Sequence, residues 1–170
     1  MINRRRAIRI ALAGLPAIWL LRSSVASADQ AFQRFLPYLI DLEGWQGKKP
    51  EGFSMEMTGT NMITATREYN NGATHFQAQV TTGAAAQGAL AATRTGINIE
   101  TSDGRMNTST IDGVAVTRTF NFKDKSGAIL VALGTSALLS FSYRGIGDDD
   151  ALTLAKKFDW KAIQAAAQPK

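Results

Sequence analysis

The sequence ITATREYNNGATHFQAQV, residues 63–80, alternates apolar and polar residues on both sides of Asn70-Asn71-Gly72. Alternation with a period of two is typical of a strand that buries one face and exposes the other to water. Asparagine and glycine tolerate positive φ, so the intervening three residues indicate a tight turn. The stretch therefore predicts an antiparallel hairpin with one apolar and one polar face.

The same pattern continues on both sides of this hairpin. Alternating or apolar runs predict further strands at 53–58, 97–101, 105–111, 114–122, 128–133 and 137–143. Their connections have the length of hairpins, which dictates antiparallel pairing. The fold class is therefore α+β, a twisted antiparallel sheet of about eight strands with flanking helices that cover one face.

Apolar residues at helical spacing predict those flanking helices. A short helix is expected at 29–42, where Pro37 would kink or split it, and a second one at 83–94. A third helix is expected to begin at Asp148-Asp149-Asp150 and to continue or restart towards Gln168. The three carboxylates are expected to cap this helix and to place favourable charge at its start.

The first 28 residues have the composition of an export signal. Met1-Ile2-Asn3-Arg4-Arg5-Arg6 is basic, an apolar stretch follows, and Ala26-Ser27-Ala28 supplies the small side chains that signal peptidase requires. We expect a cleavable signal peptide at 1–28 and a single domain at 29–170, located in the periplasm or secreted. Only twelve positions separate Arg9 from Arg22, too few for the roughly 20 apolar residues of a membrane span, so none is expected after cleavage.

The basic part of this segment indicates an export route. Arg4-Arg5-Arg6-Ala7-Ile8-Arg9 resembles the twin-arginine signal, in which paired arginines precede a variable residue, two apolar residues and a basic one. Ala7 stands where that family of signals usually has phenylalanine. The resemblance implies export of a folded protein, and the general secretory route is the alternative.

Charge and cysteine content exclude several classes of function. The formal net charge of +5 is carried by the five arginines of residues 1–28, and the remainder is formally neutral. A neutral domain lacks the basic surface that binds phosphate backbones, so nucleic acid is not an expected partner. The chain has no cysteine, which excludes disulfides, thiol catalysis and thiolate metal sites.

Metal and cofactor chemistry has little support in the sequence. His75 is the only histidine, and its place in the alternation puts it on the polar face of the hairpin. A histidine metal site would need companions, so neither a metal nor another cofactor is expected. Four methionines of the predicted strands could offer thioethers to copper(I), but the filling of core space is the favoured use. They are Met55, Met57, Met62 and Met106.

Two arginines share a strand face with apolar residues. Arg67 and Arg118 each alternate in register with the apolar side chains of their strands. A guanidinium that faces a core must pair with an acid or reach a pocket, unless its stem covers apolar surface at an edge and its head reaches water. The more specific hypothesis is a pocket for an anionic ligand lined by Arg67, Arg118, Tyr69 and Trp45.

The layout of residues 42–160 resembles known exported domains. Phe141-Ser142-Tyr143, a short loop and the sequence DDDALTLA at 148–155 look like the closing strand and helix of PsbP-like domains. Leu42-Glu43-Gly44-Trp45 followed by three strands is similar to small secreted bacterial domains of unknown function. The resemblance implies a twisted antiparallel sheet with flanking helices, and often an accessory or binding role.

The expected function follows from these observations. No Gly-x-Ser-x-Gly elbow occurs, and no nucleophile, base and orienting residue are recognisable together. We therefore expect a non-enzymatic accessory domain that binds a small ligand or an envelope protein. One alternative is a structural or stress protein of the envelope whose sheet edge pairs with a partner. Another is a hydrolase or isomerase that uses carboxylates such as Glu56, Glu68 and Asp112.

Overall fold

The computed structural model describes residues 31–57 and 60–168, so the predicted signal peptide lies outside the described residues. The helices are the 3-10 helix η1 (Ala31–Tyr38), α1 (Ala84–Thr93), α2 (Asp148–Ala155) and α3 (Trp160–Ala167). The strands are β1 (Gln46–Gly47), β2 (Glu51–Met57), β3 (Thr60–Asn71), β4 (Thr74–Gly83), β5 (Asn98–Glu100), β6 (Gly104–Ile111), β7 (Val114–Asn121), β8 (Ser126–Leu133) and β9 (Ala137–Arg144). The predicted α+β class with an antiparallel sheet is confirmed.

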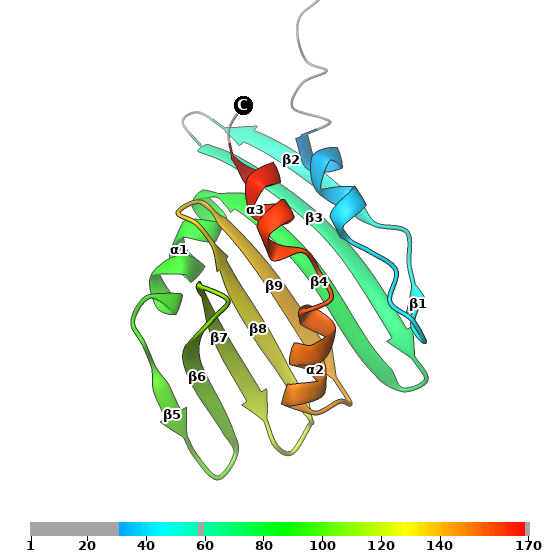
Figure 1. Cartoon of the computed structure of the whole chain (residues 1–170), viewed down its shortest axis with the longest axis vertical. Coiled ribbons are helices and arrows are strands. Elements are labelled where there is room, and N and C mark those ends of the chain that lie inside the picture. The colour runs from blue at the N-terminus through cyan, green and yellow to red at the C-terminus, as the bar shows by residue number, and fades with distance from the viewer. Residues whose placement is uncertain (1–30, 58–59, 169–170) are drawn as a thin grey trace, which may run out of the picture.

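The sheet consists of two meanders that join along one seam. β2, β3 and β4 form the first meander, and the short β1 pairs with the same edge of β3 as β2 does. β5 to β9 form the second meander, and the pairing of β4 with β9 unites the two (Figure 1). The resulting order is β2–β3–β4–β9–β8–β7–β6–β5, and α1 connects the two meanders.

Three helices lie over one face of this sheet. η1, α2 and α3 lie on the same side in Figure 1, and the alternate strand residues beneath them form the main core. Phe76, Phe141 and Phe158 cluster there, with ring centroids 5.1–6.5 Å apart. Full burial of such a side chain contributes about 1.5–3 kcal/mol. At the edge of this face Gly52 lets the Phe32 ring of η1 approach β2, because an added Cβ would lie 2.6 Å from that ring.

The opposite face has much less cover from the described residues. Ala86 and Leu90 of α1 pack on Leu138, Leu130 and Ala132 near one end of the sheet. Small side chains in α1 allow this close packing. The other outward residues of the central strands are mostly threonine, serine and glutamine. We call this side of the sheet the open face.

The local predictions for the helices are confirmed in part. A helix is present within the predicted range 29–42, but it is a 3-10 helix and contains Pro37. The three aspartates do not cap α2, because its N-cap is Gly147 and they occupy the first turn. The favourable charge at the helix start is nevertheless present. The last helix restarts at Trp160, which confirms one of the two predicted courses, and Asp159 accepts a hydrogen bond of 2.9 Å from the amide of Ala162 at its start.

Two further observations concern the surface. The core-filling role predicted for the methionines is wrong for Met55, which is 41 % exposed, and for Met62 and Met106, which are half-buried on the open face. The side chain of Met57 lies outside the described part. Within the described ranges, no helix combines the length and hydrophobicity that a bilayer crossing needs.

Candidate functional site

Arg67 fastens a loop to the sheet. It lies on the helix-covered side of β3, as predicted, and its side chain is 11 % exposed. Its Nη1 donates to the carbonyl of Leu39 (2.7 Å), its Nε donates to the carbonyl of Lys48 (2.9 Å), and Asp41 pairs with it through Nη2. The guanidinium therefore holds the connection between η1 and β1 against β3.

Tyr69 and Trp45 lie in the same region. The Tyr69 hydroxyl donates to the carbonyl of Ile40 (2.7 Å), and both aromatic rings pack on Phe76 with centroids 6.1 Å away. Burial raises the pKa of Tyr69 well above its ordinary value, against the opposite effect of the Arg67 cation. Arg67, Tyr69 and Trp45 therefore lie close together. Their hydrogen bonds and ring contacts are with other residues of the chain.

Arg118 lies elsewhere on the same face. It belongs to β7, which β8, β9 and β4 separate from β3, a distance of about 19 Å at the usual strand spacing. Its Nη1 lies 3.0 Å from Oδ1 of Asp149 and 3.5 Å from Oδ2 of Asp148. Both arginines have acidic partners, which a guanidinium facing a core requires. The structure does not bring the four residues of the predicted pocket together.

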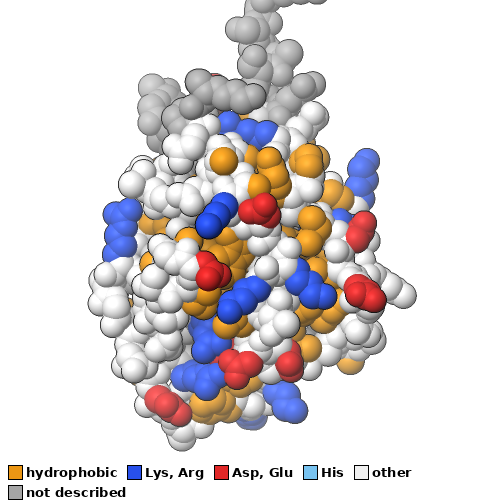
Figure 2. Space-filling view, in the orientation of Figure 1, with side chains coloured by type: hydrophobic (Ala, Val, Ile, Leu, Met, Phe, Trp, Pro, Cys, Tyr) orange, Lys and Arg blue, Asp and Glu red, His pale blue; other side chains and the backbone are white. Residues whose placement is uncertain are grey.

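Asp148 forms a buried cluster with these strands that sequence reasoning missed. Its side chain is 2 % exposed, its Oδ1 accepts from the Tyr143 hydroxyl (2.8 Å), and its Oδ2 accepts from Nη2 of Arg105 (2.7 Å). Burial raises the pKa of Tyr143 well above its ordinary value, and the bond to Asp148 adds to this effect. The cluster joins α2 to β6, β7 and β9. Acidic and basic side chains are interspersed with apolar ones on this side of the molecule (Figure 2).

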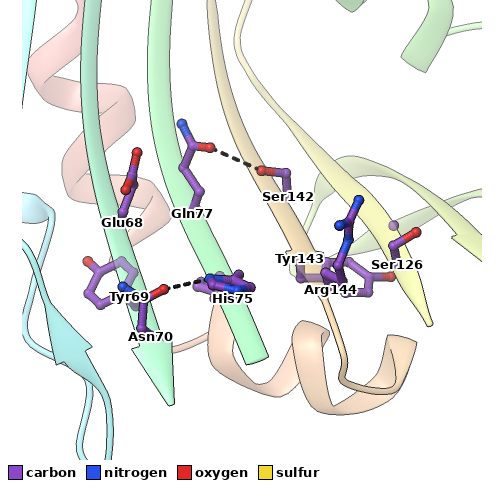
Figure 3. Close-up of a pocket in the computed structure, with 11 residues that line it drawn as sticks. Glu68, Tyr69, Asn70, His75, Gln77, Ser126, Ser142, Tyr143 and Arg144 are labelled. Atoms are coloured by element: carbon purple, nitrogen blue, oxygen red, sulfur yellow. Dashed lines mark hydrogen bonds between the residues drawn. The ribbon is translucent and has the colours of Figure 1, made fainter. Parts of the chain in front are cut away.

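Polar side chains form two rows across the open face, where β3 and β9 end and β4 and β8 begin. Cross-strand pairing places each residue of a row opposite the next. The outer row is Asn70, His75, Arg144 and Ser126, and the inner row is Glu68, Gln77 and Ser142. Figure 3 shows these side chains projecting from the neighbouring strands. The alternation of β4 thus places His75 on an exposed face, as predicted.

The two rows line a cavity of about 420 Å³. Ser142 Oγ donates to Oε1 of Gln77 (3.3 Å), so the amide NH₂ of Gln77 remains a donor for another group. Nδ1 of His75 lies 2.6 Å from Oδ1 of Asn70. Because that carbonyl oxygen can only accept, Nδ1 donates in this contact.

Arg144 is the cation of this cavity. Its side chain is exposed, and no hydrogen bond or ion pair joins its guanidinium to another described residue. By contrast, the carboxylate of Glu68 is paired with Lys48 at 2.5 Å. A guanidinium offers five donors in a planar arrangement that fits carboxylate or phosphate oxygens. The cavity can therefore bind an anionic group at Arg144 and neutral polar groups at Gln77 and Ser142.

A metal site has less support from the structure than the anion site at Arg144. In residues 31–57 and 60–168, no three histidine or acidic side chains are arranged to hold a metal ion.

No protein-family model, no curated protein and no solved structure matches this chain. A functional assignment therefore rests on the geometry of the open face.

Proposed function

We propose that this chain is an exported, non-enzymatic binding domain that holds the anionic group of a small ligand in the cavity of the open face. The unpaired guanidinium of Arg144 is the observation that carries the proposal. The amide of Gln77 and the hydroxyl of Ser126 offer neutral donors in the same cavity. The cavity volume of about 420 Å³ lies in the range of small-molecule sites.

The arrangement favours binding over hydrolysis. Glu68 is paired with Lys48, Glu56 lies near the far end of β2, and Asp112 lies in the turn between β6 and β7. These three carboxylates belong to separate parts of the sheet, so they do not form an acid and base pair around one substrate.

The β2 edge of the sheet supports a structural role, in which a partner strand pairs with it, less than the cavity supports ligand binding. β2 forms one outer edge, and its exposed Glu51 and Glu56 place negative charge there. Charged residues on an edge oppose the addition of a further strand. A small ligand is therefore a better-supported partner than an envelope protein that pairs with this edge.

Export remains part of the proposal on sequence grounds. The signal peptide, the twin-arginine route and the periplasmic location rest on residues 1–28, and the likeness to PsbP-like domains rests on layout. The mass of the protein recovered from the cell envelope tests cleavage after Ala28. Recovery of the uncleaved chain from the cytoplasm would contradict it.

The only histidine of the chain provides a direct test of ligand binding. Acetate and inorganic phosphate, titrated into the full chain, should shift the NMR signals of the His75 ring. Replacing Arg144 by glutamine should weaken this binding about tenfold or more, since hydrogen bonds to a charged group contribute about 1.5–3 kcal/mol.

Arg94→Gln is the matched control. Arg94 is exposed just after α1 and its replacement removes the same charge far from the cavity, so affinity should be unchanged. Unshifted His75 signals with both anions would refute the proposed function. Equal weakening in the two variants would also refute it, because it would indicate a general charge effect.

A further inference from the structure

A second cavity continues the first across the sheet. It has a volume of about 580 Å³ and shares Ser126 and Gly127 with the first. The first cavity is lined by residues of β3, β4, β9 and β8. The second is lined by residues of β8, β7 and β6, by Ile99 of β5, and by Thr101 and Asp103 of the turn between β5 and β6. The two cavities form one groove that runs across the strands of the open face, which we call the cross-strand groove.

The chemistry of the cross-strand groove changes along its length. Its β4–β9 end carries Arg144 and the amide of Gln77. At its other end Met106 lies opposite Ile99 in the strand register, and neither side chain carries a charge or a strong hydrogen-bonding group. Ile99 is 52 % exposed and Met106 is half-buried, so apolar surface is open to solvent there.

We propose that the natural ligand is an amphiphile with a single anionic head group and a long unbranched apolar chain. This inference rests on the proposed function and names the class of ligand. The head group binds Arg144, and the chain lies over Met106 and Ile99. From β9 to β5 the groove crosses four strand spacings, or about 19 Å, which a long acyl chain can span.

The charge distribution also supports this orientation. Among the described residues that line the groove, Arg144 at the β9 end is the only cation without an acidic partner, because Arg105 of the second cavity donates to Asp148 on the other face. At the opposite end, an apolar chain that covers the exposed Ile99 removes apolar surface from water, which is favourable. A wholly polar ligand would leave that end of the groove unused.

Three probes test the inference on the full chain, with dodecanoate kept below its micellar concentration and dodecanol below its solubility limit. Dodecanoate carries head group and chain, acetate carries the head group alone, and dodecanol carries the chain alone. Dodecanoate should bind at least about 100-fold more tightly than acetate, because each buried methylene strengthens binding about fourfold. It should also bind more tightly than dodecanol, and Arg144→Gln should abolish that difference.

A methionine pair provides the matched variants. Met106→Thr should weaken dodecanoate binding about 4- to 16-fold and leave acetate binding unchanged, because it removes roughly one to two methylenes of contact. Met62→Thr changes a half-buried methionine of the same face outside the groove, and should leave both affinities unchanged. If Met106→Thr does not fold, Ile99→Ser serves instead, because that side chain is already half exposed.

The outcomes separate this inference from the proposed function. Equal affinities for acetate and dodecanoate would overturn the amphiphile while leaving the anion site intact. Failure of all probes to shift the His75 signals would overturn both. Binding to vesicles of phosphatidylglycerol without binding to monomeric dodecanoate would also overturn the inference, because it would indicate a membrane surface rather than a single amphiphile.

Discussion

A comparison of Asp148 with Asp149 tests how burial changes the contribution of an ion pair to the free energy of unfolding. The two residues are adjacent in the first turn of α2, and both lie within 3.5 Å of the Arg118 guanidinium. Their side chains are 2 % and 84 % exposed, respectively. Replacing each by asparagine removes the same charge from the same helix end. The two variants therefore differ in the burial of the carboxylate and in the number of partners that it has.

The structure gives the expected magnitudes. Asp148→Asn removes the charge that accepts from Tyr143 and Arg105, and breaking a buried pair costs about 3–5 kcal/mol. Because Arg105 and Arg118 keep side-chain exposures of 36 % and 19 %, part of their hydration is recovered, and we expect about 3 kcal/mol. Asp149→Asn breaks an exposed pair, which is worth about 1 kcal/mol or less.

Urea unfolding of the two variants measures this difference. Tryptophan fluorescence and circular dichroism should give coincident transitions, and the free energy of unfolding should fall by about 2 kcal/mol more for Asp148→Asn. The loss of interaction with the helix dipole is common to both variants and cancels in the comparison. Equal destabilisation, or a loss below about 1 kcal/mol for Asp148→Asn, would refute the reasoning.

Two further predictions concern the other buried polar groups. Arg67→Met should lower the free energy of unfolding by about 2–3 kcal/mol in urea, because the carbonyls of Leu39 and Lys48 lose a charged donor. Stability should also fall above pH 10, since Tyr69 and Tyr143 keep their protons in the folded state while the unfolded chain releases them. Each contributes about 1.4 kcal/mol per pH unit, measured by urea unfolding at several alkaline pH values.

Both predictions have simple controls. Arg94→Met alters an exposed arginine and should change stability by less than about 0.5 kcal/mol, and an equal effect of Arg67→Met would contradict the fastening role. Tyr69→Phe and Tyr143→Phe should each reduce the alkaline slope. Ultraviolet absorbance that shows all three tyrosines ionised in the folded protein near pH 10 would contradict the second prediction.

The sequence predicted the strand faces well because alternation is a local property. It placed Arg67 and Arg118 towards the helices and His75 on the exposed side, and the structure confirms all three. It also predicted the requirement that a core-facing guanidinium pair with an acid. The aspartates at the start of α2 were assigned as caps because local composition does not show that Gly147 takes that position.

The candidate site was beyond local reasoning. Arg144 lies beside His75 and Ser126 only because β9 pairs with both β4 and β8. Which distant strands become neighbours depends on the packing of whole faces, since hairpin signals specify only consecutive strands. Alternation from Ser142 could have placed Arg144 on the polar face, but its neighbours there come from the pairing of β4 with β9.

The seam between the two meanders has a consequence for how the chain folds. Within each meander, strands that pair are close in the sequence and can meet early, whereas the seam joins distant residues, as in the contact of Ser140 with Gln79 over 61 positions. Closing so long a loop lowers the conformational entropy of the chain before contacts at the seam can offset that loss. The residues of the cavity lie on both sides of the seam, so the cavity exists only once β4 and β9 have paired.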